Sequence, residues 1–313
     1  MAPAGRHQVV VGVDGSPHAR LAMRWASRFA LLLDADVTAV HGTGLLDHVD
    51  GRLVPAHAHI DEIRRALEEE WCGRLDRTHL PHRVEVVERP AVDALLAAAH
   101  EGPTDLVVVG TRGRGIPRAQ ALGSTALQLL RQATVPVLVV PGPSGDRSVE
   151  LRRLVIGVDG SVAAQAALLW ASGLACLTGA RCEVVAVAED DPVFPLGTAA
   201  TVTAAGEEDA PDRLRAIAEQ ACESLRDLGV TCEVTVRRGT AADALLGVAR
   251  DRHADLVVVG SSGEGSAGNP LLGSVSRQVA HDAGRPVAVV PHPGHRHPGA
   301  HHPASAATAG RRS

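Results

Sequence analysis

Short apolar runs alternate along the chain with longer segments whose apolar residues recur at helical spacing. Residues 9–13 form a short apolar run, which is typical of a strand buried on both faces of a sheet. The next segment, about 17–33, places Leu21, Trp25 and Phe29 at intervals of one helical turn. The pattern therefore predicts a strand followed by an amphipathic helix.

The same alternation continues to residue 140. It predicts strands at 9–13, 36–40, 83–88, 106–109 and 137–140, and helices at about 17–33, 57–78, 91–101 and 124–132. Strands that alternate with helices form a parallel sheet with right-handed crossovers and helices on both faces. The predicted fold class is therefore a doubly wound α/β fold.

The sequence then repeats itself. GVDGS occurs at 12–16 and 157–161, DLVVVG at 105–110 and 255–260, and VPVLVVP at 135–141 matches RPVAVVP at 285–291. Matches in one order along the whole length indicate a duplicated domain rather than a chance motif. We expect a first copy at 1–143, a second copy at 150–293 with a longer loop near 189–210, and a disordered tail at 294–313.

The fifth predicted strand of each copy begins at a proline, Pro136 or Pro286. Proline cannot donate to a sheet ladder, so it suits an edge strand. A bare apolar edge such as VLVV would promote aggregation. Pairing with the equivalent strand would cover it, so we expect the two copies to pack together or the chain to form a homodimer.

Composition narrows the functional classes. The net charge is −5 and the chain contains no lysine, which argues against a general nucleic-acid-binding protein. The sequence starts with a short polar segment and has no apolar stretch of about 18 residues, so we expect a cytoplasmic protein with no membrane partner. The five cysteines form no CxxC pair, which favours buried, reduced thiols.

Candidate chemistry lies after the fourth strand of each copy, where the sequence fits Gly-x2-Gly-x9-Gly-Ser. The loop opens at the carboxyl end of a parallel strand, where α/β sheets bind ligands. Glycines permit positive φ and let the backbone approach an anion, and the following helix start offers unpaired N–H groups. The candidate phosphate-binding residues are Gly110, Gly113, Arg114, Gly115, Gly123 and Ser124, and Gly260, Gly263, Gly265, Gly273 and Ser274.

Two alternatives stay open for the polar residues of this crevice. Ser124 and Ser274 could simply be helix N-caps. Asp14 and Asp159, in the GVDGS turns with Gly12 and Gly157, could contact a nucleoside or cap the following helix. His41 follows the second strand and aligns with Ala188, so we do not expect it to be essential in both copies.

Competing motifs are absent or misplaced. Gly263, Gly265 and Gly268 spell GxGxxG, but the dinucleotide fingerprint belongs after the first strand, and the first copy has Arg118 at the third glycine position. The sequence contains no GxxxxGK[ST], GxSxG or HExxH motif, and we expect no catalytic or metal-ligating residues. The histidines of the tail are more typical of a solvated segment than of a metal site.

Together, the GVDGS turn, the glycine loop and the closing PVLVVP resemble the universal stress protein family in its tandem form, over about 8–141 and 153–291. The resemblance implies five parallel strands per copy in the order 3-2-1-4-5 and ATP held by the glycine loops, with Mg²⁺ allowed beside it. It implies that Asp14 and Asp159 lie near the adenosine and that a residue around Gly42 or Glu189 lies at the adenine edge. It also adds Thr125 and Val275 to the loop residues that hold the nucleotide.

The resemblance also implies a role in stress or dormancy responses, homodimers joined through the fifth strands, and at most weak ATP hydrolysis. A non-enzymatic ATP-binding regulator, acting through an unknown protein partner, is the first hypothesis; a slow ATPase or nucleotide-transferring enzyme is the alternative. The first loop carries Arg112, Arg114 and Arg118, whereas the second has Ser262, Glu264 and Gly268. We therefore expect the first site to bind ATP more tightly than the second.

Overall fold

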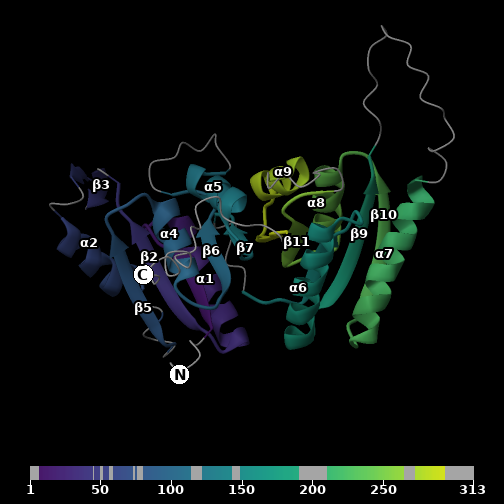
Figure 1. Cartoon of the computed structure of the whole chain (residues 1–313), viewed down its shortest axis with the longest axis horizontal. Coiled ribbons are helices and arrows are strands. Elements are labelled where there is room, and N and C mark those ends of the chain that lie inside the picture. The colour runs from purple at the N-terminus through teal and green to yellow at the C-terminus, as the bar shows by residue number, and fades with distance from the viewer. Residues whose placement is uncertain are drawn as a thin grey trace, which may run out of the picture.

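The computed structural model describes residues 7–44, 46–49, 52–55, 59–72, 75, 80–113, 122–142, 149–189, 210–263 and 272–292 (Figure 1). The first copy contains β1 (Gln8–Gly12), α1 (Pro17–Leu33), β2 (Asp36–Gly42), β3 (Leu46–Val49), β4 (Arg52–Pro55), α2 (Ile60–Ala66), the π-helix η2 (Leu67–Trp71), β5 (His82–Val87), α4 (Ala91–His100), β6 (Thr104–Gly110), α5 (Ser124–Gln132) and β7 (Val137–Val140). The second contains β8 (Arg153–Gly157), α6 (Val162–Thr178), β9 (Arg181–Ala188), α7 (Ala210–Asp227), β10 (Cys232–Arg238), α8 (Ala241–Asp251), β11 (Leu256–Gly260), α9 (Ser274–Asp282) and β12 (Val287–Val290).

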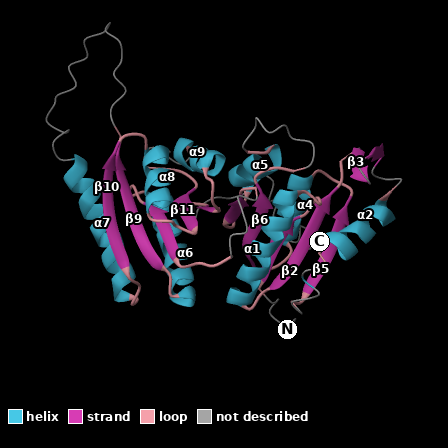
Figure 2. Cartoon of the chain, turned by 180° about the vertical axis from the view of Figure 1, so that it is seen from behind, coloured by secondary structure: helices cyan, strands magenta, loops and turns pink. Residues whose placement is uncertain are grey.

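Strand order confirms the predicted fold class. The strands run β5-β2-β1-β6-β7 in the first copy and β10-β9-β8-β11-β12 in the second, which is the order 3-2-1-4-5 in both. Neighbours within each copy pair in parallel. Helices cover both faces of the sheet (Figure 2). Residues 143 and 293, which end the two predicted domains, and the predicted tail lie outside the described ranges, and the domain boundaries stay predictions.

The two fifth strands pair with each other inside the chain. β7 and β12 run antiparallel, with Leu138 opposite Ala288 and both side chains fully buried. The two five-stranded sheets thereby become one sheet of ten strands among the described residues. This arrangement covers both apolar edges by packing the two copies together, which is one of the two solutions expected from the sequence. Both fifth strands are then occupied within the chain, so a homodimer stays a prediction only for a different surface.

The hydrophobic core is continuous across the β7–β12 pairing, which we call the seam. One apolar cluster contains residues of α1, η2, α6 and α7 on one face of the sheet, and a second contains residues of α4, α5, α8 and α9 on the other. Phe29 of α1 stacks on Trp170 of α6 with ring centroids 6.0 Å apart, which joins the copies through their helices as well. Because the core residues are mostly Val, Leu and Ala, this pair is an unusual aromatic contact for the chain.

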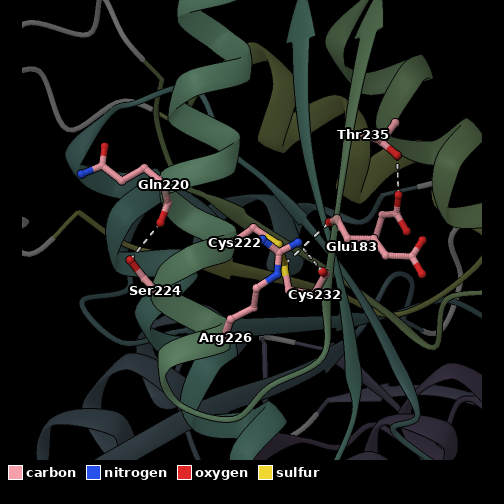
Figure 3. The surroundings of a disulfide bond; sticks show 8 residues. Glu183, Gln220, Cys222, Ser224, Arg226, Cys232 and Thr235 are labelled. Atoms are coloured by element: carbon pink, nitrogen blue, oxygen red, sulfur yellow. Dashed lines mark hydrogen bonds between the residues drawn. A yellow bond between two sulfur atoms is a disulfide. The ribbon is translucent and has the colours of Figure 1, made fainter.

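The cysteine prediction was wrong for one pair. Cys222 on α7 and Cys232 on β10 form a disulfide, with their Cα atoms 5.6 Å apart (Figure 3). The pairing depends on how the helix packs against the outer strand, which cysteine spacing alone does not reveal. Cys72 and Cys182 are buried thiols, as expected, whereas the thiol of Cys176 is exposed.

The sequence analysis also predicted that the chain has no membrane-spanning segment. Among the helices that the structure describes, none combines the length and the apolar character that a bilayer crossing demands.

We expect Leu138→Ala to lower the free energy of unfolding by about 2–5 kcal/mol, because it opens a cavity where β7 meets β12. Leu31→Ala is the matched control, since Leu31 is 56% exposed and its truncation should change stability by less than about 0.5 kcal/mol. Urea denaturation of both variants measures the difference. Equal losses would show that the seam adds nothing to stability.

Candidate functional site

Each copy places its crevice where the first and fourth strands end. Gly12 and Gly157 close the first strands, and a Cβ on either would lie 3.1–3.3 Å from side chains of the adjacent strand and helix. For Gly12 these neighbours are Val109 and Leu95. The two glycines therefore permit close packing beneath the crevice, and their predicted part in ligand binding stays a prediction.

Asp14 and Asp159 hold the turn that follows. The Oδ1 atom of each accepts a hydrogen bond from the backbone N–H two residues on, from Ser16 or Ser161, at 2.9 Å. Each serine hydroxyl in turn caps its helix at 3.1 Å. The two aspartates therefore hold the turn, and the helix caps that we considered for them are made by Ser16 and Ser161 instead. Contact between the aspartates and a nucleoside stays a prediction.

The other carboxylate oxygen of each aspartate faces the glycine loop. A Cβ built on Gly113 would lie 2.6 Å from Asp14 Oδ2, and one built on Gly263 would lie 2.8 Å from Asp159 Oδ2. Any side chain at these positions would displace the carboxylate. The structure therefore brings the aspartate and the second loop glycine together in both copies.

In this loop the described glycines matter because they have no Cβ, which lets neighbouring atoms approach closely, and not because they adopt positive φ. A Cβ on Gly110 or Gly260 would meet the backbone of the first helical turn at 2.9 Å or less. Among the described residues, the glycines with positive φ lie elsewhere, including Gly15 and Gly160. Our expectation of positive φ was therefore wrong for the described loop glycines; Arg114, Gly115 and Gly265 lie outside the described residues.

The loop returns to the strand end before the helix starts. The N–H of Gly123 donates to Thr111 O at 2.6 Å, and the N–H of Gly273 donates to Ser261 O at 2.7 Å. These paired bonds fix where α5 and α9 begin relative to the sheet. The loop ends are thus held in the same way in two copies whose intervening sequences differ.

Ser124 and Ser274 are not N-caps. Gly123 and Gly273 occupy the cap positions, and neither helix start has a side-chain cap hydrogen bond. Ser124 with Thr125, and Ser274 with Val275, therefore form the first helical turn. A helix start capped by glycine leaves backbone N–H groups for an external anion, which the helix dipole also favours.

In the second copy these residues surround a cavity of about 570 Å³. That volume lies within the range of small-molecule sites. The cavity gathers every described second-copy residue that the sequence predicted: Gly157, Asp159, Gly260, Gly263, Gly273, Ser274 and Val275.

The cavity also contains apolar residues that the sequence analysis missed: Val185, Val187, Leu214 and Leu245. Glu189, a candidate for the adenine edge, adds a carboxylate to the lining. The two valines end the second strand, so their place at the same sheet edge as Asp159 was available from the strand pattern. Leu214 belongs to α7, whose position relative to the crevice depends on tertiary packing.

The register of the strand pairing corrects the alignment of His41 with the second copy. Val40 pairs with Gly12 and Val185 pairs with Gly157, so His41 corresponds to Ala186 rather than to Ala188. His41 is buried, with Nδ1 2.6 Å from Val13 O and its ring edge-to-face with Trp71. It is therefore a packing residue of the first copy.

The same strand register shows that the two candidates for the adenine edge, Gly42 and Glu189, are not at equivalent positions in the two copies. Gly42 corresponds to Val187, and Glu189 lies two residues beyond that position. A Cβ on Gly42 would lie 2.5 Å from Ala91 Cα, so the strand end contacts the start of α4 in the first copy. Val187 and Glu189 both line the second cavity.

The first crevice contains a histidine that the second lacks. His18 occupies the position of Ala163, and its Nδ1 lies 2.9 Å from Thr111 Oγ1. A Cβ on Gly142 would lie 2.6 Å from the His18 ring, so the imidazole packs against the second residue after β7. Burial first, and then the Arg112 guanidinium, lower the pKa of His18 from 6.5, while Asp14 acts in the opposite sense.

We expect His18→Ala, which installs the residue of the second copy, to make folding less sensitive to acid. The folded protein binds the His18 proton less tightly than the unfolded chain does, because the folded-state pKa is lowered. Wild type therefore loses stability as pH falls through 6.5 toward that pKa, and His18 contributes nothing of this kind above 6.5. The variant should gain relative to wild type between about pH 8 and about pH 5.5 in denaturant unfolding. A pH-independent difference would contradict this.

Known proteins match both halves of the chain. The sequence profile of the universal stress protein family matches residues 5–141 and 150–291. A universal stress protein of Mycolicibacterium smegmatis is 33% identical over 304 residues, covering 92% of this chain and 98% of that protein. Universal stress protein Rv2005c of Mycobacterium tuberculosis is 29% identical over 308 residues, with the same coverage of 92% and 98%.

A solved structure supports the fold. The crystal structure of a universal stress protein from Archaeoglobus fulgidus superposes with a TM-score of 0.67 at 20% identity, covering 91% of this chain and 98% of that one. The two family matches together span most of the chain, one on each half. The chain therefore belongs to the universal stress protein family.

Proposed function

We propose that this chain is a regulatory ATP-binding protein that holds one nucleotide in each copy. The cavity of the second copy carries the proposal. The glycine loop, Asp159 and the start of α9, which has no side-chain cap, all line it. Backbone N–H groups at a helix start suit phosphate oxygens. The cavity also has apolar lining residues, which suit a purine base, so its lining offers groups for both parts of a nucleotide.

The residues present fit such a ligand in a definite orientation. The loop from Gly260 and the first turn at Ser274 would bind the phosphates, and Val185, Leu214 and Leu245 would contact the base. The carboxylate of Asp159 would accept a hydrogen bond from a ribose hydroxyl. Mg²⁺ would accompany the phosphates as a counterion, supplying charge neutralisation there.

Nucleotide occupancy would act through the loops. A phosphate bound by backbone N–H groups stabilises one loop conformation, and a protein partner that contacts this surface would respond to it. We place this activity in the cytoplasm, in stress or dormancy responses, with a homodimer as the assembly. Slow ATP hydrolysis is the alternative, and it requires a general base near the γ-phosphate.

The two sites should differ in affinity. Arg112 lies in the first crevice, close enough to affect the pKa of His18, whereas the second copy has Ser262 there. An added cation beside a phosphate is worth about 1 kcal/mol at a partly exposed site, or about fivefold in Kd. We therefore expect tighter binding in the first copy.

Isothermal titration with ATP tests both points. Wild type should bind two ATP per chain, and Gly123→Asp or Gly273→Asp should each remove one site by placing a carboxylate at the phosphate position. Gly284→Asp is the matched control, because a Cβ there meets nothing within 4 Å, and it should keep both sites.

The remaining outcomes separate the alternatives. Equal affinities in the two single-site variants would contradict the predicted ranking. Conversion of bound ATP to ADP, followed by chromatography, would favour the slow ATPase. No binding of ATP, ADP, AMP or a cyclic nucleotide by the wild type would overturn the proposal.

A further inference from the structure

The disulfide of the second copy lies at the outer edge of the sheet. Cys222 is on α7 and Cys232 is on β10, the terminal strand, and Figure 3 shows the bond joining the helix to the strand. Cys222 is fully buried and Cys232 is 6% exposed. Arg226 adds a second link, because its Nη2 donates to Cys232 O at 3.0 Å.

The same helix forms part of the nucleotide cavity. Leu214, two turns before Cys222, lines the cavity wall. Ile217 Cδ1 lies 3.1 Å from the position of a Cβ on Gly160, which is in the turn held by Asp159. The position of α7 therefore determines both the apolar wall and the surroundings of the aspartate turn.

Most of the fully buried side chains of α7 are small. They are Ala218, Ala221 and Cys222, with Leu225 as the large one among them, and Leu214 and Ile217 are half-buried. Small side chains bury little apolar area, so the first three stabilise the helix only weakly. The covalent link to β10 therefore adds a substantial constraint to a contact in which Leu225 is the main fully buried apolar group.

The first copy provides an internal comparison. By register, Cys232 corresponds to His82, and Cys72 precedes His82 by the same spacing of 10 residues that separates Cys222 from Cys232. The residue before Cys72 is Trp71, which packs against His41, whereas the second copy has Ala221 there. The second copy thus has a disulfide where the first has a large aromatic contact.

We propose that the Cys222–Cys232 disulfide is a reversible redox control of the second nucleotide cavity. In the oxidised form the bond fixes α7 and its Leu214 against the cavity. Two low-molecular-weight thiols, or one dithiol, reduce it: the S–S bond breaks, two thiols form, and the reductant leaves as its disulfide. The proposed ligand rests on the proposed function, and the proposed cytoplasmic location fits, because disulfides there are usually transient and redox-sensing.

The neighbouring thiols do not compete for the pair at neutral pH. Cys182 lies opposite Cys232 in the strand register, and burial, followed by the nearby Cys176, raises its pKa to about 12. A protonated thiol is a poor nucleophile, so Cys182 does not exchange with the disulfide. Cys176 is exposed on α6 and would permit cross-linking between chains, so the experiment uses Cys176→Ser throughout.

The test measures ATP binding at the second site alone, in a Gly123→Asp, Cys176→Ser background, before and after dithiothreitol. Mass spectrometry of alkylated protein reports the state of the bond. Reduction should raise Kd by about fivefold or more. The Cys222→Ser, Cys232→Ser double variant should have the raised Kd with or without dithiothreitol.

An unchanged Kd after verified reduction would overturn the redox control, as would absence of the bond in protein exposed to an oxidised low-molecular-weight disulfide. Failure of ATP to bind in any form would instead count against the nucleotide proposal. Hydrogen exchange over α7 then decides about the helix: faster exchange on reduction supports the control, and unchanged exchange overturns it.

Discussion

The antiparallel pairing of β7 with β12 is the constraint on which the rest of the structure depends. Each copy alone would end its sheet in a strand of four apolar residues, with backbone groups of one side unpaired. Joining these strands makes one sheet and one continuous core on each face. It also places α5 and α9, whose first turns receive the glycine loops, over the same face of that sheet (Figure 1).

The crevices depend on glycines that are required for different reasons. Gly110 and Gly260 admit the backbone at the start of α1 and α6, and Gly113 admits the carboxylate of Asp14. Gly15 and Gly160 have positive φ and form the turn itself. Alanine at the loop glycines would therefore collide with specific atoms, so these positions resist change even before any ligand is considered.

The sequence predicted the repeat and the parallel α/β sheet from local patterns, and the crevice from the rule that parallel strands end at one sheet edge. The strand order came from the family resemblance, not from these patterns. It did not predict the β3–β4 hairpin, although the Asp50-Gly51 pair between two short runs is a typical hairpin signal. Leu214 and the Cys222–Cys232 bond were beyond its reach, because both depend on how α7 packs against β9 and β10. The positive φ expected of the loop glycines was an assumption about conformation, and the described backbone uses their missing Cβ instead.

Because of the β7–β12 pairing, the association of the two copies does not depend on the concentration of the protein. Because both fifth strands belong to one chain, their association is intramolecular and proceeds at an effective concentration that dilution does not change. A pair of separate domains joined only by such strands would dissociate as the protein became scarce. In this chain the two crevices stay together at any abundance, so a partner that contacts both copies meets them in a fixed ratio of one to one.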